Sequence, residues 1–341
     1  MKDFELLVLP GTNPSGVAMT RDILSAATLF ATRQGLAVPT WGLYSPFGGR
    51  IGLQGGLSAD TVRLPGRTGG TRSILLVPGL WVASAAELHQ RLQSDACQRA
   101  IRLITTHVAR GGQVAASCSA VFLLQAAGVL QGRAATTTWW LAPELARIAP
   151  ETRVEAQRLL CVDGPVITAG AAFAQADVML YLLRQRFGSK LVEGVARVLL
   201  LHERTEQAQY VLPAMLASGD ALVTRLTQRV EATLPDVPSV SSLAAELRIS
   251  ERTLARHVHH ATGMGTTALI RSIRLQRARS LLQHSRMSVE QIAAAVGYRD
   301  ATALRRLVRK ASGTTPVGLR ALTGMSASSA SQTNRSRRDR A

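Results

Sequence analysis

The sequence predicts two domains of different fold class: a flavodoxin-like α/β domain with a mostly parallel sheet and helices on both faces, then an all-α domain. Over residues 1–205, short apolar segments that end in turn residues alternate with segments of helical spacing. This alternation is typical of a parallel sheet covered on both faces. From residue 239 to residue 311 the spacing is helical throughout. A length of 341 residues also favours two domains over one.

The elements of the first domain follow from apolar runs and the turn residues between them. Strands are expected at residues 4–9, 38–44, 73–77 and 113–116. Helices are expected at residues 17–32, 87–108, 119–127, 173–186 and 190–201. Residues 154–161 and 166–169 flank the turn sequence Asp163-Gly164, so they predict a hairpin.

Two prolines mark the boundary between the domains. Pro235 and Pro238 follow a predicted helix at residues 213–233, and each disfavours further helix. The expected divisions are a front domain at 1–205, a linker with a connecting helix at 206–237, an all-α domain at 238–322 and a tail at 323–341. The tail is rich in Ser and Arg with almost no apolar residues after position 325, so we expect it to be a disordered basic segment.

The charge of the chain indicates the class of its partner. Residues 236–341 hold 18 Lys and Arg against 6 Asp and Glu, which is +12 of the total net charge of +18. This concentration predicts a polyanionic partner, because each neutralised phosphate releases counterions. The three cysteines are widely spaced without a CxxC pattern, which argues against disulfides or a metal site. No apolar run reaches the length of a membrane span, and no cofactor is expected.

The all-α domain contains an internal duplication. The two copies are related by a shift of 49 residues before a turn and of 50 residues after it. The matching pairs are Ser239 and Ser288, Val240 and Val289, Leu243 and Ile292, Ala244 and Ala293, Leu247 and Val296, then Leu254 and Leu304, Arg256 and Arg306, Val258 and Val308, and Gly263 and Gly313. A constant offset that changes once indicates two related folds with one residue inserted in the turn. An ordinary helical bundle with a basic face does not explain this pattern.

Each copy has the parts of a helix-turn-helix unit. A Ser cap begins the first helix of each copy, and Gln291 completes a capping box in the second. In the turn, Gly297 can adopt a left-handed conformation, and Arg248 occupies the equivalent position. Ser250 can cap the second helix of the first copy.

The second helix of each copy buries an apolar pair at i, i+4 and carries polar and basic side chains on its other faces. Such a helix fits the major groove, where Arg bonds guanine bidentately and Thr contacts a thymine methyl group. Further basic side chains bind phosphate. The candidate DNA-binding residues are Arg252, Thr253, Arg256, His257, Arg299, Thr302, Arg305, Arg306, Arg309 and Lys310.

Residues 239–320 resemble the AraC/XylS family of bacterial regulators. The family signature is matched by Ile292-Ala293, Val296-Gly297-Tyr298, Arg306, Gly313, Pro316 and Arg320, and residues 274–282 resemble the family's linker helix. Leu304 and Val308 replace the usual aromatic core residues, and Thr266 replaces a usual Pro. The resemblance implies a sequence-specific transcription regulator whose linker helix holds both units in successive major grooves of double-stranded DNA. It also implies RNA polymerase as a partner.

In the front domain, the strand at 113–116 leads almost directly into a helix, and Cys118 lies at the sharp turn between them. This position faces a helix N-terminus, where the pKa of a thiol falls and anions bind. The order of elements, the loop Pro78-Gly79 and residues 128–133 resemble the class I glutamine amidotransferase-like (PfpI/ThiJ) superfamily. Joined to the AraC-type domain, they resemble GlxA-type regulators.

A cysteine nucleophile needs a nearby base, and the resemblance implies a His in the segment after the elbow helix. Thr138 stands at that position, and residues 15–18 carry no acidic group. His89 and His107 are expected to be surface residues. We therefore expect a binding pocket for a small effector and no enzymatic activity. The candidate pocket residues are Gly79, Cys118, Ser119, Thr138 and Trp139.

Two alternatives to the sensing domain remain open at this stage. In the first, the front domain is purely structural or dimerising. In the second, the protein is a PfpI/ThiJ-type cysteine hydrolase or amidotransferase with an appended DNA-binding domain. The resemblance implies a small nitrogenous metabolite as effector and a homodimeric protein. It also implies a place in the bacterial cytoplasm, at the nucleoid when DNA is bound.

Overall fold

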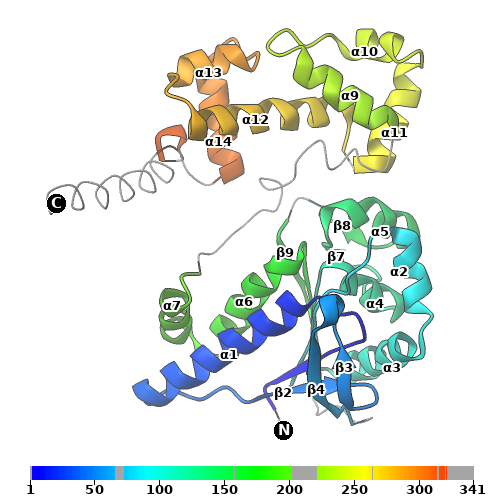
Figure 1. The fold of residues 1–341 in the computed structure, drawn as a ribbon, viewed down its shortest axis with the longest axis vertical. Helices are drawn as coiled ribbons and strands as arrows, with labels where there is room; N and C mark the ends of the chain where they lie inside the picture. Colours follow the sequence, from blue (N-terminus) through cyan, green and yellow to red (C-terminus); the bar gives the residue numbers. More distant parts are fainter. Residues whose placement is uncertain are drawn as a thin grey trace, which may run out of the picture. The chain divides into compact units, whose positions relative to one another are not determined.

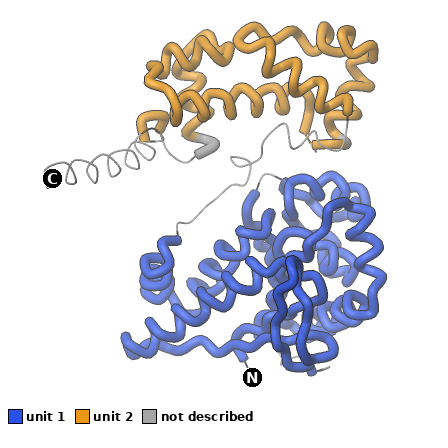
Figure 2. Tube along the Cα trace, viewed as in Figure 1, with its two compact units in different colours: residues 1–207 blue, residues 208–341 orange. Residues whose placement is uncertain are grey.

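The computed structural model describes residues 2–65, 73–156, 158–201, 221–262, 264–312, 315–318 and 320, without the side chains of 260 and 310–312. They belong to two compact units, residues 1–207 and 208–341 (Figure 2). The predicted tail, residues 206–220 of the predicted linker and the beginning of the predicted helix at 213–233 lie outside the described residues.

The first unit is built on a sheet of eight strands in the order β3-β4-β2-β1-β5-β6-β10-β9. The strands are β1 (Phe4–Leu7), β2 (Trp41–Ser45), β3 (Gly49–Gly52), β4 (Ser58–Arg63), β5 (Ile74–Val77), β6 (Gln113–Ser117), β9 (Leu160–Asp163) and β10 (Val166–Ala169). The pairs from β4 through β10 are parallel, and β3 and β9 join the two edges antiparallel. The predicted mostly parallel sheet is confirmed.

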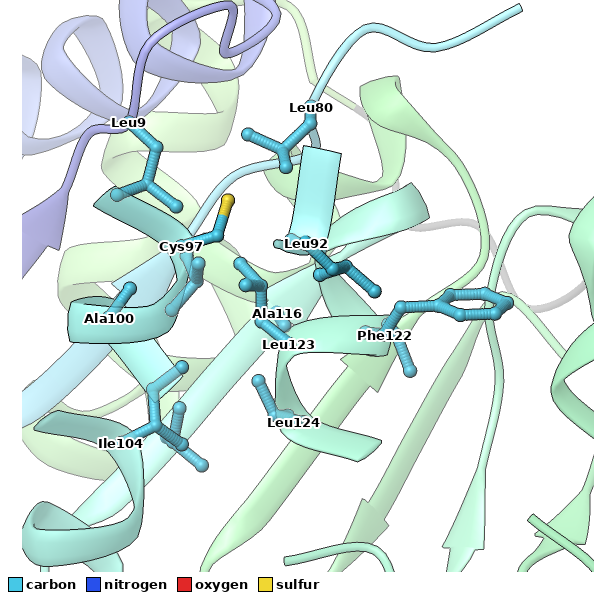
Figure 3. Close-up of a cluster of buried hydrophobic side chains, with 14 of the residues drawn as sticks. Leu9, Leu80, Leu92, Cys97, Ala100, Ile104, Ala116, Phe122, Leu123 and Leu124 are labelled. Carbon is cyan, nitrogen blue, oxygen red and sulfur yellow. The ribbon is translucent and has the colours of Figure 1, made fainter. Parts of the chain in front are cut away.

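Helices cover both faces of this sheet, as predicted (Figure 1). One face packs against α1 (Pro14–Gln34), α6 (Gln175–Phe187) and α7 (Ser189–Val198), and the other against α2 (Ala85–Leu92), α3 (Asp95–Ala109), α4 (Val121–Ala126) and α5 (Ala142–Ile148). Since successive strand residues point to opposite faces, Phe4 and Leu6 enter one core and Leu7 and Leu9 the other. Figure 3 shows part of the second core, where Leu9 and Cys97 lie near each other.

Two predicted elements of this unit need correction. The single helix expected at 87–108 is two helices, because Ser94 begins α3 by accepting a hydrogen bond from the Cys97 N–H. The hairpin is confirmed at Asp163-Gly164, where β9 and β10 pair antiparallel. Residues 153–154, however, form β8 (Arg153–Val154), which pairs with β7 (Ala134–Ala135) in a separate small sheet.

The described part of the second unit is helical, as predicted. Its helices are α9 (Ala221–Ala232), α10 (Val240–Glu246), α11 (Glu251–Thr262), α12 (Thr266–His284), α13 (Val289–Ala295) and α14 (Ala301–Ser312). Helix α9 buries Val223, Leu226 and Val230 and packs against α11 and α12. It is therefore part of the compact helical unit.

Candidate nucleic-acid interface and sensing site

The first helix-turn-helix unit consists of α10 and α11. Ser239 begins α10, and its hydroxyl accepts a hydrogen bond from the Ser242 N–H at 3.1 Å. The turn that follows places Arg248 in the left-handed region, with φ +59°. Ser250 then begins α11, because its hydroxyl accepts the Thr253 N–H at 3.1 Å. Both caps predicted for this unit are confirmed.

The second unit, α13 and α14, repeats this geometry. Ser288 and Gln291 form the predicted capping box, with the Gln291 N–H donating to Ser288 and the Gln291 side chain accepting the Ser288 N–H. Gly297 is left-handed, with φ +81°, at the position that corresponds to Arg248. Asp300 corresponds to Ser250, and its carboxylate accepts the Thr302 N–H at 2.7 Å.

The predicted apolar pairs form the contact between the helices of each unit. Leu254 and Val258 of α11, and Leu304 and Val308 of α14, are fully buried. Ala244 and Ala293 are 2% exposed, which fits close approach of two helices. The remaining faces of α11 and α14 are thereby turned away from the core.

The structure places most of the candidate DNA-binding side chains on these outer faces. The exposed ones are Arg252, Arg256, Arg299, Thr302, Arg305, Arg306 and Arg309. Thr253 and His257 are half-buried, and the Thr253 hydroxyl lies 2.9 Å from that of Ser250. Arg305 forms an ion pair with Glu290 of α13. The side chain of Lys310 lies outside the described residues.

Helix α12 joins the two units. It is one continuous helix of 19 residues, and it packs against α9 and α11 as well as against α13 and α14. A helix of this length spans about 28 Å. It therefore fixes the separation of α11 and α14 within one compact body.

In the front unit, the sharp turn at Cys118 lies at the carboxyl end of β6. Cys118 has φ +56°, and a Cβ on Gly79 would lie only 2.8 Å from the Cys118 Cβ. The Ser119 hydroxyl donates to the Leu80 carbonyl at 2.6 Å, and the Thr137 hydroxyl donates to the Cys118 carbonyl at 2.7 Å. Gly79, Cys118 and Ser119 are thus brought together.

The expectation of a lowered pKa at this turn is wrong. Burial raises the pKa of the Cys118 thiol, and this outweighs hydrogen bonds from the Ser119 N–H and the side chains of Thr138 and Ser119. Thr138 therefore contacts the thiol from the position where a base was expected. Trp139 follows in a short turn of 3₁₀ helix and is half-buried.

Each of the two histidines expected at the surface has a ring nitrogen close to an oxygen atom of another residue. His107 is 1% exposed, so the prediction is wrong for this residue. Its Nε2 lies 2.9 Å from the carbonyl of Gln113, at the end of β6 opposite to Cys118. His89 is partly exposed, and its Nε2 lies 3.1 Å from a carboxylate oxygen of Glu144.

Sequence reasoning missed two aromatic residues near this turn. Trp81 and Phe173 are 53% and 60% exposed, and they follow the carboxyl ends of β5 and β10, the two neighbours of β6. Cys118 follows the carboxyl end of β6 itself. Ligands of open α/β sheets bind at the carboxyl ends of the strands. Trp81 and Phe173 each stand four positions after the end of a predicted strand, and this spacing would have identified them as candidates.

Two further properties concern the described residues alone. None of their helices is long and apolar enough to cross a membrane. Within the same residues, no group of three or more His, Cys, Asp or Glu side chains is arranged to hold a metal ion.

Comparison with known proteins identifies both domains. Residues 89–185 match the DJ-1/PfpI family, and residues 243–322 match a helix-turn-helix domain family. The chain thus combines a DJ-1/PfpI domain with an AraC-type helix-turn-helix domain, as the resemblance predicted.

Two relatives match most of this chain and most of their own length. The chain is 26% identical to the HTH-type transcriptional regulator GlxA of Rhizobium meliloti, over 82% of this chain and 84% of that protein. It is 25% identical to the HTH-type transcriptional regulator CdhR of Pseudomonas aeruginosa, over 90% of this chain and 88% of that protein. A crystal structure of an AraC family transcriptional regulator from Pseudomonas putida aligns with 22% identity and a TM-score of 0.47, covering 57% of this chain and 98% of that one.

Proposed function

We propose that this protein is a sequence-specific DNA-binding transcription regulator of the AraC type, with a non-catalytic front domain that senses a small molecule, mediates dimerisation, or does both. The observation that supports DNA binding is the duplicated helix-turn-helix geometry. In both copies the second helix buries a Leu–Val pair and exposes its arginine-bearing face, and α12 packs against both of these helices. We propose residues 1–205 as the front domain, 206–237 as the linker and connecting helix, and 238–322 as the DNA-binding domain.

In this proposal α11 and α14 enter successive major grooves on one face of the duplex. The helix that joins the two units, α12, is about 28 Å long, of the order of one helical turn of DNA, about 34 Å. Arg256 and Arg306 are exposed at equivalent positions and read base edges. Arg252 and Arg309 contact phosphates and fix the register.

The first test removes the equivalent arginines. Arg256→Ala and Arg306→Ala should each weaken binding to a selected duplex by about 1–3 kcal/mol, because each removes one base-reading side chain. Gel-shift titrations at a defined salt concentration measure this, with circular dichroism as the check on folding. Arg153→Ala is the matched control, because Arg153 is an exposed arginine of the other unit. Unchanged affinity in both interface variants would reject the assignment.

The proposal of a non-catalytic front domain is supported by the state of Cys118. Its thiol has a raised pKa and contacts Thr138, whereas a nucleophile needs a base to become a thiolate. His107 is held at the opposite end of β6, and the His89 Nε2 lies 3.1 Å from a carboxylate oxygen of Glu144. The thiol and the exposed rings of Trp81 and Phe173 suit recognition of a small molecule better than chemistry on it.

The sensing role is tested by ligand-dependent stability. A thermal-shift screen of the full chain against small amines and amino-acid derivatives should find a compound that raises the melting temperature. Trp81→Ala should lose this shift, and Phe47→Ala, at an exposed aromatic residue that packs against Arg99, should keep it. A shift that survives in Trp81→Ala and in Thr138→Val would place the ligand elsewhere.

A second candidate function is a cysteine hydrolase or amidotransferase with an appended DNA-binding domain. The left-handed backbone of Cys118 favours it, since a strained strand-to-helix turn is the geometry of nucleophile elbows. Assays of glutaminase, peptidase and glyoxalase activity test this candidate, with Cys118→Ser as the control. An activity that the variant loses would overturn the non-catalytic proposal.

The remaining partners follow from the regulator proposal. We propose that the protein acts as a homodimer, contacts RNA polymerase and works in the bacterial cytoplasm at the nucleoid. Analytical ultracentrifugation tests the first point. Co-purification from cells that carry a tagged copy tests the other two.

A further inference from the structure

One candidate DNA-binding residue, Arg305, forms an ion pair on the outer face of the second helix-turn-helix unit. The Arg305 guanidinium on α14 donates to the Glu290 carboxylate on α13. Both side chains are well exposed, 50% for Arg305 and 62% for Glu290. Exposed ion pairs add little to stability, so the main effect of this pair is on the position of the Arg305 guanidinium.

The charges around Arg305 form a small cluster. The pKa of the Glu290 carboxyl is lowered, mainly by a backbone N–H and by Ser288, with a further contribution from Arg305. Arg305 also helps to lower the pKa of Asp300, which caps α14. Arg305 therefore sits near two carboxylates that remain charged at neutral pH.

The first unit lacks this cluster. At the equivalent positions, Ser241 replaces Glu290, Ser250 replaces Asp300 and Ala255 replaces Arg305. The first unit nevertheless forms the same caps, turn and buried pair. The bihelical fold consequently does not require the cluster.

We propose that Glu290 is a specificity-determining residue of the DNA interface, which orients Arg305 toward a base edge and prevents it from binding phosphate indiscriminately. This inference rests on the proposed DNA-binding function. Non-specific binding depends on the number of phosphates that cations neutralise, and an arginine already paired with a carboxylate contributes little to that number. A guanidinium fixed in orientation loses less rotamer freedom when it bonds a base bidentately.

The test measures discrimination rather than affinity alone. The full chain is first used to enrich a duplex from a pool with a randomised core of about 20 base pairs, two turns of DNA. The wild type and Glu290→Gln are then titrated with that duplex and with a scrambled one at a fixed salt concentration. We expect Glu290→Gln to tighten binding to the scrambled duplex and to lower the specific-to-scrambled ratio about tenfold, the size of one base contact.

A matched control is available next to the first helix-turn-helix unit. Glu246 of α10 pairs bidentately with Arg229 of α9, at 2.6 and 3.1 Å, and both side chains are partly exposed. Glu246→Gln removes the same charge from an ion pair between α9 and α10, neither of which is a proposed recognition helix. It should leave the ratio unchanged.

The mechanism is tested in the Arg305→Ala background, where Glu290→Gln should no longer alter the ratio. Two results would overturn the inference: equal tightening on both duplexes by Glu290→Gln, or a lowered ratio that persists without Arg305. If the wild type enriches no sequence at all, the DNA-binding function itself fails. A wild type that discriminates, with a Glu290→Gln variant that discriminates equally well, rejects this inference alone.

Discussion

The two helix-turn-helix units share a backbone plan but differ on their outer faces. Both begin with a capping Ser, turn through a left-handed residue and bury a Leu–Val pair at i, i+4. On the outer faces, Ala255 corresponds to Arg305 and His259 to Arg309. The positions that make the fold are alike in both copies, and so are Arg256 and Arg306, whereas the neighbouring outer positions differ.

This difference has a consequence for the DNA site. Two units with equal surfaces would read two similar half-sites. The second unit carries more permanent positive charge, so we expect it to supply the larger share of phosphate contacts and of salt dependence. The operator should then be asymmetric, with different sequences under α11 and α14.

The largest expected effect tests whether the two cores are equivalent. Leu254→Ala and Leu304→Ala each remove a fully buried side chain. Each should lower the free energy of unfolding by about 2–5 kcal/mol, from lost burial and the cavity left behind. Urea denaturation followed by circular dichroism measures both. A variant that costs less than about 1 kcal/mol would show that its unit is loosely packed, and the proposed equivalence would be wrong.

The turn residues allow a sharper comparison, because the two units reach the same conformation with different residues. Gly297→Ala should lower the free energy of unfolding by about 2 kcal/mol or more, from the left-handed backbone and a steric clash. The added Cβ would lie 2.3 Å from the carbonyl oxygen of Pro235. Arg248→Gly should raise the free energy of unfolding by about 0.5 kcal/mol, because the relief of left-handed backbone strain exceeds the entropy cost of glycine.

Thermal and urea denaturation of the two turn variants measure these changes. Gly265→Ala serves as a control, because Gly265 has φ −74° and a Cβ there meets no atom within 4 Å. Opposite signs at 248 and 297 are the expected pattern. Destabilisation by Arg248→Gly would mean that the Arg248 side chain makes a stabilising contact and that its backbone strain is small.

Features of the DNA-binding unit were predictable because they are local in sequence. Caps, the turn glycine and the i, i+4 pairs depend on residues a few positions apart, and the duplication indicated the caps and the apolar pairs in both copies. The Glu290–Arg305 pair was not predictable, since it joins side chains 15 residues apart on two helices. The sequence supplies candidate charges, but only packing decides which of them meet.

The front unit shows where sequence reasoning fails for a different reason. His107 could have been predicted as buried, because it continues the stripe of Ala100, Leu103 and Ile104 on α3. A Cβ on Gly112 would lie 2.4 Å from the His107 ring, so this glycine leaves room for the imidazole. The raised pKa of Cys118 could not have been predicted, since it depends on how deeply the fold buries the thiol.

The smallest expected effect concerns the helix caps. Gln291→Ala removes half of the capping box of α13, in which the Gln291 side chain accepts the Ser288 N–H at 2.8 Å. It should lower the free energy of unfolding by about 0.5 kcal/mol, the low end of capping effects. Ser242 is the equivalent residue in α10, and its hydroxyl lies 2.9 Å from the Ser239 hydroxyl. Ser242→Ala should therefore cost less than Gln291→Ala.

Precise urea titrations of both variants measure this difference, and Ser288→Ala and Ser239→Ala calibrate the scale, each with an expected cost of about 1 kcal/mol. Those two serines accept backbone hydrogen bonds of the same length, 3.1 Å, so their costs should agree. We expect Ser288→Ala and Ser239→Ala to cost equal stability, and Gln291→Ala to cost more than Ser242→Ala. This result would show that the hydrogen bond from the Ser288 N–H to the Gln291 side chain distinguishes the two units. Equal costs at Gln291 and Ser242 would remove that distinction, because the side chain at the third helical position would then matter through helix propensity alone.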